Sequence, residues 1–183
     1  AKNHGLVTFS PWLTDGTDNS SDFGFQPVPG SCSGMTNIYV NDATFNAGDY
    51  TTAAGDDMLG NGTASAPYAT ITKAVSVAMV GANIYVDAGT YQEQVQIGKS
   101  LNIIGLDRSS TTVLAPVSMT PVSNSVWAST YPVIYAFGNS NTINISKIAV
   151  NGDNGRSLSY FMGVQYFEAN GTFTNNKVTC IHD

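Results

Sequence analysis

Toward its C-terminus the chain repeats itself: residues 131–153 align with residues 161–183 at an offset of 30, without a gap. A period of about 20–50 residues that contains several short strands is typical of a solenoid, in which each repeat stacks on the next. We therefore expect equivalent side chains of the two repeats to form columns. The apolar pairs are Tyr131/Phe161, Ile134/Val164, Ile143/Phe173, Ile148/Val178 and Val150/Cys180, and the identical pairs are Phe137/Phe167, Thr142/Thr172, Lys147/Lys177 and Asp153/Asp183.

Short strands punctuated by Gly, Asn, Asp or Pro run through much of the remaining chain. The segments at residues 37–40 and 83–86 have the same sequence, Asn-Ile-Tyr-Val. Such short strands in a repeat favour a parallel β-helix over a β-sandwich, which needs longer strands joined by hairpins and is the alternative. Further strands are expected at 95–97, 101–104, 113–114, 133–137, 143–150, 164–167 and 173–180.

One amphipathic helix is predicted from Pro67 to Met79. Its apolar residues Ile71, Ala74 and Val75 recur at helical spacing, and a proline suits the first turn of a helix. The terminal coil of a β-helix exposes unpaired backbone groups and apolar columns, so solenoids need caps. We expect this helix to cap the N-terminal end.

A composition change near residue 34 suggests a boundary. Two prolines and three glycines fall between Gly24 and Gly34, which is typical of a linker or an extended strap. The predicted organisation is therefore an N-terminal strap or tail of a preceding module at residues 1–34, followed by a β-helix domain at residues 35–183. Because the repeat continues to Asp183, we expect that domain to be incomplete at its C-terminus.

The run Asn37–Asp42, the Gly/Asp/Asn-rich loop after it and the run Ser65–Val75 resemble the opening of proteins of the pectin-lyase-like superfamily. Residues 81–91 and 95–105 extend the resemblance, which is close over 35–115 and loose over 130–183. It implies an all-β fold, a right-handed parallel β-helix with an N-terminal capping α-helix. It implies no single activity, because lyases, hydrolases and bacterial surface proteins share this opening.

Charge excludes some classes of function. Charged residues make up 11% of the chain and the net charge is −6, which disfavours nucleic-acid binding because phosphate affinity depends on clustered Lys and Arg. No apolar run approaches the roughly 18 residues that cross a membrane, so we expect no membrane insertion. Abundant Ser, Thr and Asn suit an extracellular or cell-surface location.

Acidic residues in the long loop at 41–66 are the candidate metal ligands. Asp42, Asp49, Asp56 and Asp57 are the carboxylates of this loop, and carboxylate oxygens are ligands that calcium prefers. The alternative is a solvated loop in which these residues stabilise turns. Calcium is therefore the one cofactor considered.

No convincing catalytic constellation can be assembled from the sequence. Lyases of the superfamily that the chain resembles pair calcium-binding aspartates with an Arg or Lys base, but Arg108 and Arg156 are isolated in turn-like contexts. Glycosidases need two carboxylates at a defined separation, and no pair stands out. The nominal pairs are Asp87/Glu93 and Asp153/Glu168. We expect no catalytic residue.

Aromatic and cysteine residues leave alternatives open. Tyrosines such as Tyr39, Tyr85 and Tyr91 would form a sugar-stacking face if they pointed outward, whereas the repeat pairs Tyr131/Phe161 and Phe137/Phe167 are expected in core columns. Cys32 and Cys180 are the only cysteines, and the sequence does not decide whether they pair.

The leading interpretation is a non-catalytic structural or adhesive β-helix module of an extracellular protein, able to assemble into a filament. The expected partners are other copies of the chain, adjacent modules of a longer chain, and glycans. The alternatives are a fragment of a polysaccharide lyase or glycoside hydrolase and a carbohydrate-binding module. The residues expected to mediate assembly are Phe9, Trp12, Phe23 and Phe25 in the strap and Phe173, Val178 and Cys180 in the last repeat.

Overall fold

Every paired strand in the structure runs parallel to its neighbours. The computed structural model describes residues 36–123, 126, 129–152 and 158–181, all within the unit Gly34–Asp183. The predicted strap at residues 1–34 and its boundary lie outside the described residues and stay predictions.

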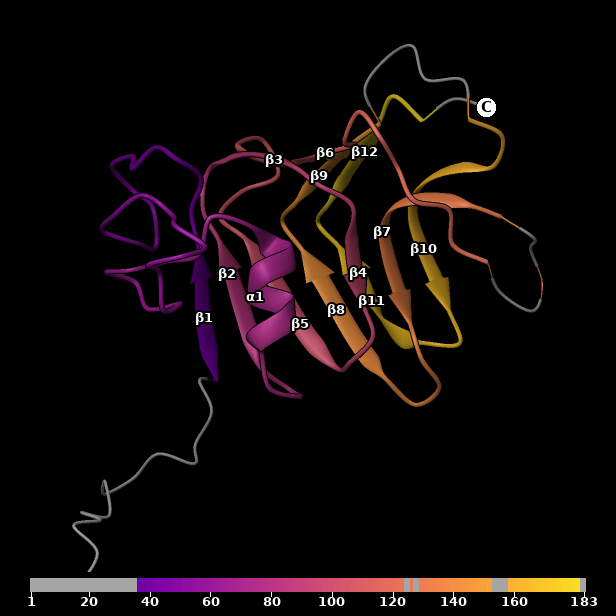
Figure 1. Cartoon of the computed structure of the whole chain (residues 1–183), viewed down its shortest axis with the longest axis horizontal. Helices are drawn as coiled ribbons and strands as arrows, with labels where there is room; N and C mark the ends of the chain where they lie inside the picture. The colour runs from indigo at the N-terminus through magenta and orange to yellow at the C-terminus, as the bar shows by residue number, and fades with distance from the viewer. Residues whose placement is uncertain (1–35, 124–125, 127–128, 153–157, 182–183) are drawn as a thin grey trace, which may run out of the picture. The chain divides into compact units, whose positions relative to one another are not determined.

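Twelve strands form three sheets in this part of the chain (Figure 1). The five-stranded sheet contains β1 (Asn37–Val40), β2 (Asn83–Val86), β5 (Leu101–Gly105), β8 (Thr142–Ser146) and β11 (Asn170–Thr174). The four-stranded sheet contains β3 (Gly89–Gln92), β6 (Thr111–Leu114), β9 (Ala149–Asn151) and β12 (Lys177–Thr179). The three-stranded sheet contains β4 (Val95–Ile97), β7 (Tyr131–Phe137) and β10 (Phe161–Phe167).

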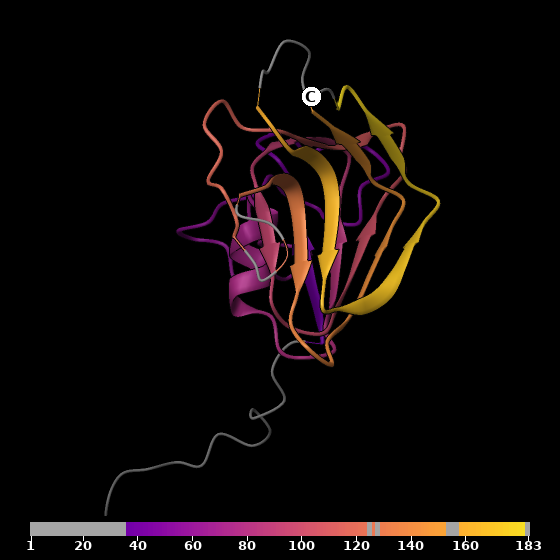
Figure 2. The same ribbon diagram turned by 90° about the vertical axis from the view of Figure 1, so that its right-hand side faces the viewer.

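From β2 onward the chain visits the three sheets in turn, so one circuit makes one coil (Figure 2). Strands β2–β3–β4, β5–β6–β7 and β8–β9–β10 are three complete coils, and each strand pairs with its equivalent in the next coil. This is the predicted parallel β-helix. It excludes the β-sandwich, whose sheets are antiparallel.

Inward side chains stack in register along the coils. In the five-stranded sheet one column runs Ile38, Ile84, Ile103, Ile145 and Phe173. Its four isoleucines are at most 2% exposed. A second column, in the four-stranded sheet, runs Tyr91, Val113, Val150 and Val178. Because β-branched side chains fit a pleated surface and pack against their equivalents, the columns form one continuous core.

The repeat offset is 30 in only one sheet. Strands β7 and β10 pair at this offset, which confirms Tyr131/Phe161, Ile134/Val164 and Phe137/Phe167. In the other two sheets the offset is 28, so Phe173 pairs with Ile145 and Val178 with Val150. The predicted pairs Ile143/Phe173, Ile148/Val178, Val150/Cys180, Thr142/Thr172 and Lys147/Lys177 are therefore wrong, and Asp153/Asp183 lies outside the described residues.

The cause of the shift is a shorter corner. Residues 138–141 connect β7 to β8, whereas only residues 168–169 connect β10 to β11. Because side chains alternate with a period of two, losing two residues keeps every side chain on its original face. The apolar positions of the two repeats therefore match at an offset of either 28 or 30 residues.

Two predicted strands are each divided by a corner. The segments 143–150 and 173–180 become β8 with β9 and β11 with β12, and Lys147 and Asn175 at the corners have φ values of 58° and 55°. Asn176 links this corner of adjacent coils: its Oδ1 accepts from the N–H of Ile148 at 2.8 Å, and its Nδ2 donates to the Ile145 carbonyl at 2.9 Å. Strand β3 was not predicted.

Corner lengths differ greatly between coils at one position only. Between the four-stranded and three-stranded sheets, two residues (93–94) connect β3 to β4, sixteen (115–130) connect β6 to β7, and nine (152–160) connect β9 to β10. The strands on either side keep their parallel pairing in each case. The length of the connection at this corner therefore varies between coils without changing how the strands on either side pair.

The helix α1 (Ile71–Val77) begins four residues after the predicted start. Thr70 is its N-cap and accepts a hydrogen bond from the Lys73 N–H at 3.1 Å. Ile71, Ala74 and Val75 are buried, and α1 contacts β1, β2 and β4. Since β4 is the edge strand of the three-stranded sheet, α1 covers that edge as the predicted N-terminal cap. No helix among the described residues is long and apolar enough to cross a membrane.

The loop between β1 and α1 covers the free edge of the five-stranded sheet. Tyr39 donates its backbone N–H to the Gly62 carbonyl at 2.9 Å and accepts from the Tyr68 N–H at 3.0 Å. The Asn41 N–H donates to the Tyr68 carbonyl, also at 3.0 Å. Backbone groups that an edge strand would leave unpaired are thus satisfied on this side.

We predict that Ile71→Asp lowers the free energy of unfolding by about 3 kcal/mol or more, because it places an unpaired charge in the core. Val77→Asp is the matched control: Val77 lies on the same helix and is 44% exposed, so its replacement should cost less than about 1 kcal/mol. Urea unfolding followed by circular dichroism measures both. Equal midpoints for the two variants would contradict the capping role of α1.

Candidate functional site

A ladder of asparagines lies on the outward side of the five-stranded sheet. Asn37, Asn83, Asn102 and Asn144 occupy equivalent positions in four successive coils. From Asn83 onward, each Nδ2 donates to the Oδ1 of the asparagine in the preceding coil, at distances of 2.9–3.0 Å. Thr172 continues the ladder by donating its hydroxyl to Asn144 Oδ1 at 2.9 Å. These amides therefore hold neighbouring coils together.

Two tyrosines extend along the same outward side. The rings of Tyr39 and Tyr85 are stacked, with centroids 5.4 Å apart, and the Tyr50 ring packs edge-on against Tyr85 at 5.2 Å. Stacking of this kind joins the first two coils and uses ring faces that a sugar would need. Tyr91, another candidate for sugar stacking, is buried in a core column, as is Phe161 of the repeat pair.

Each aspartate of the 41–66 loop binds backbone groups nearby. Asp42 Oδ1 accepts from the Thr44 N–H and Asp49 Oδ2 from the Asn46 N–H, each at 2.7 Å. Asp56 Oδ1 accepts from the N–H groups of Met58 and Leu59, and Asp57 accepts from those of Ala69 and Thr70. In the described part of the chain, no group of three or more His, Cys, Asp or Glu side chains could hold a metal ion.

The nominal catalytic carboxylates Asp87 and Glu93 both tie a segment to the coils. Asp87 is fully buried and accepts from the backbone N–H groups of Tyr50 at 2.5 Å and Thr51 at 3.1 Å. Glu93 accepts from the N–H groups of Ile71 and Thr72, each at 2.8 Å, at the start of α1. Asp87 therefore anchors the long loop, and Glu93 holds the capping helix.

Burial raises the pKa of Asp87 above its ordinary value of 3.8, and hydrogen bonds from the turn at Leu59 and Met58 lower the pKa of Asp56 below 3.8. We therefore expect opposite pH effects on folding. The contribution of Asp87 to the free energy of unfolding should fall as pH rises from 3.8 through its raised pKa. The contribution of Asp56 should be present above pH 3.8 and be lost as pH falls through its lowered pKa. Carboxyl ¹³C NMR titration measures both, and an Asp87 pKa at or below 3.8 would contradict this prediction.

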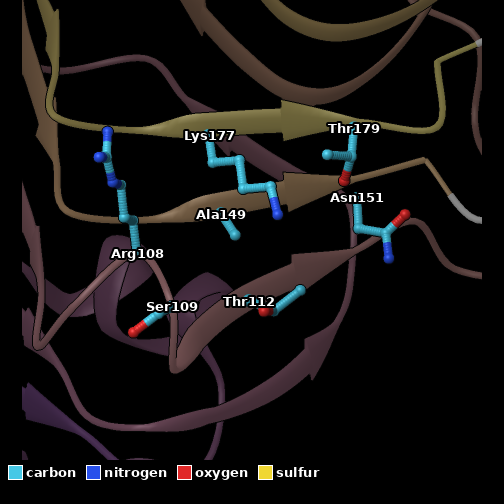
Figure 3. Close-up of a pocket in the computed structure, with 7 residues that line it drawn as sticks. All are labelled: Arg108, Ser109, Thr112, Ala149, Asn151, Lys177 and Thr179. Atoms are coloured by element: carbon cyan, nitrogen blue, oxygen red, sulfur yellow. The ribbon is translucent and has the colours of Figure 1, made fainter.

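A shallow groove of about 310 Å³ lies on the outer side of the four-stranded sheet (Figure 3). Its side chains come from β6, β9, β12 and the corner before β6. The lining residues are Arg108, Ser109, Thr112, Ala149, Asn151, Lys177 and Thr179. Two cations, three hydroxyls and an amide make this an environment for oxygen-rich, anionic ligands. The lining contains no carboxylate or imidazole, and hence no acid–base pair for glycoside cleavage.

Sequence reasoning missed this groove because its two cations are far apart in the chain. In the sequence, Arg108 is isolated in a turn-like context, and Lys177 is a repeat position. Coil stacking brings them to one surface, since the corner at Arg108 and strand β12 belong to the same stacked side. Finding it from the sequence requires both offsets of this sheet, 37 residues from Thr112 to Ala149 and 28 residues from Ala149 to Lys177.

Apolar columns become exposed at the last described coil. Val178 is 45% exposed, whereas Val113 and Val150 in the same column are fully buried. Phe173 is likewise partly exposed at the end of the isoleucine column. Cys180 follows β12 at a φ of 57° and is partly exposed, so it does not stack on Val150. The other residues expected to mediate assembly, Phe9, Trp12, Phe23 and Phe25, lie outside the described residues, as does Cys32.

Part of the chain matches a known protein family. Residues 53–106, just under a third of the chain, match the model of a family described as a protein of unknown function (DUF1565), which is associated with the parallel β-helix. The matched segment contains the end of the long loop, α1 and the strands β2 to β5. The chain matches no curated protein.

Proposed function

We propose that the chain is a non-catalytic structural or adhesive module of an extracellular or cell-surface protein, whose last coil stacks on a further coil. The observation that carries the proposal is the exposed end of the core at Phe173 and Val178. Soluble proteins rarely leave the end of an apolar column uncovered, and an exposed strand edge favours pairing with another chain.

The two ends of the described β-helix differ, and the difference supports stacking of the last coil on a further coil. On the β1 side, the loop at 41–70 and α1 satisfy the backbone groups and cover the core. On the other side the sheets end at β10, β11 and β12, and inward residues there are partly exposed. A surface that is closed at one end and open at the other suits addition of units in one direction.

The proposed partner is a second copy of the chain or an adjacent module of the same polypeptide. Phe9, Trp12, Phe23 and Phe25 of the strap supply apolar side chains for covering Phe173 and Val178. Such a contact joins two different surfaces, so it propagates into a filament when every unit repeats it. The resemblance to the pectin-lyase-like superfamily, which includes bacterial surface proteins, is consistent with this arrangement.

We predict that Val178→Asp weakens self-association at least tenfold, because it places a charge at the contact, and that deletion of residues 1–34 does the same without unfolding the β-helix. Sedimentation velocity over a range of concentrations measures association, and circular dichroism reports folding. Val117→Asp is the matched control: Val117 is 84% exposed in the connection between β6 and β7, outside the apolar columns, and its replacement should leave association unchanged.

A native chain that stays monomeric at high concentration would rule out the version with identical copies. A variant lacking residues 1–34 that still polymerises would rule out the strap as the covering segment. Either result leaves an adjacent module as the partner to be tested in a longer chain.

A second candidate function, binding of acidic glycans, is favoured by the groove that Arg108 and Lys177 line. Both cations lie on an otherwise acidic chain, beside hydroxyl groups that suit sugars. The lining of this groove supplies no carboxylate, so the groove itself does not hold the acid–base pair of a glycoside hydrolase.

We expect an alginate oligosaccharide to bind the native chain with an affinity that falls at high salt. The double variant Arg108→Gln/Lys177→Gln should bind it with a Kd at least tenfold higher. The control Lys73→Gln/Lys99→Gln removes the same charge outside the groove and should change the Kd less than twofold. Isothermal titration calorimetry measures each. An equal increase in Kd in the two double variants would show an effect of net charge and would contradict the groove as the binding site.

A further inference from the structure

The connections that follow the strands of the five-stranded sheet form one row along the β-helix, which we call the corner row. Because these strands run parallel, the connections all leave the same end of the sheet, one after each strand (Figure 1). In order from the β1 side, the corner row consists of residues 41–70, 87–88, 106–110, 147–148 and 175–176.

The sign of the charge changes from one end of the corner row to the other. The first two connections contain five aspartates and no Lys or Arg. The last three connections contain Arg108 and Lys147, and Lys177 follows the last of them directly. Asp107 is the single carboxylate in this second part. The corner row is therefore acidic on the β1 side and basic toward β12.

Two apolar side chains project from the acidic part of the row. Met58 is 92% exposed and Leu59 is 84% exposed. Asp56 fixes the turn that presents them, since its Oδ1 accepts from the N–H groups of Met58 at 2.7 Å and Leu59 at 2.9 Å. The hydrogen bonds that the Asp56 and Asp57 carboxylates accept come from N–H groups and a threonine hydroxyl, none from Lys or Arg. Adjacent apolar side chains beside two carboxylates form a surface that suits a partner both apolar and basic.

The basic end of the row carries the complementary combination. Phe173 and Val178 lie in β11 and β12, the two strands that the last connection joins, and both are partly exposed at the ends of apolar columns. Lys177 precedes Val178 and is exposed, and Lys147 is exposed one coil earlier. Apolar side chains beside cations at this end thus match apolar side chains beside carboxylates at the other end.

We propose that the turn at Met58 and Leu59 of one copy packs beside Phe173 and Val178 of a second copy. The contact places the two carboxylates of the turn opposite Lys177. This inference rests on the self-association proposed above, and it names a surface of the next copy that takes part besides the strap. A two-fold contact would bring two acidic turns or two basic corners together, and like charges across an interface oppose binding. The copies therefore meet head to tail, and the contact repeats from one copy to the next.

An exchange of charges tests the contact. Met58→Lys places a cation opposite Lys177 and should raise the Kd of self-association at least tenfold. Lys177→Glu places a carboxylate opposite Asp56 and should raise the Kd by a similar factor. The double variant Met58→Lys/Lys177→Glu restores opposite charges across the contact, so its Kd should lie within about threefold of the native value. Sedimentation velocity of the full chain measures the Kd, and circular dichroism verifies the fold of each variant.

Val80→Lys is the matched control, since Val80 is 75% exposed in the connection between α1 and β2, which enters the opposite end of the five-stranded sheet. It should leave the Kd unchanged, and Val80→Lys/Lys177→Glu should associate as weakly as Lys177→Glu. The proposed contact is overturned if either single variant of the charge exchange associates as the native chain does, or if their combination associates no better than the single variants. Both of these results leave the self-association itself standing, whereas a native chain that stays monomeric contradicts the self-association and the contact together.

Discussion

In-register hydrogen bonding between parallel strands of successive coils is the interaction on which this structure depends. The strands are three to seven residues long, and none could persist without the equivalent strand beside it. Pairing places each inward residue on its equivalent, as in the column from Ile38 to Ile145, so the same register that satisfies the backbone also builds the core. The asparagine ladder reinforces this register from outside.

Because each coil contacts only its neighbours, a terminal coil has one side on which no other coil covers its backbone groups and apolar columns. At the β1 side, carboxylates hold the covering segments in place. Glu93 binds the start of α1, Asp57 binds the residues just before it, and Asp87 anchors the long loop. Acidic residues that suggested metal binding or catalysis in the sequence thus have structural partners. The negative charge of the chain is partly a result of how that end is closed.

The fold class, the capping helix and most strands could be predicted from the sequence, because apolar columns in a solenoid repeat along the chain. The register could not be predicted fully. A loss of two residues between Phe167 and Asn170 leaves the alternation of inward and outward side chains unchanged, so residues 161–183 match at an offset of 30 although two sheets use 28. The groove and the contact of Asn41 with Asp49 were not predictable either. Arg108 and Lys177 line one groove, and Asn41 contacts Asp49, because coils and loops distant in the sequence pack together, and no local sequence pattern marks that packing.

The corner between the four-stranded and three-stranded sheets has a consequence for how such a chain changes over time. Connections of two, nine and sixteen residues there leave the neighbouring strands paired in parallel, so the length of the connection does not alter the strand pairing at that position. New surface can therefore be acquired one coil at a time without rebuilding the core. The apolar columns beneath these connections remain under a common packing constraint, because each inward residue stacks on its equivalent in the next coil.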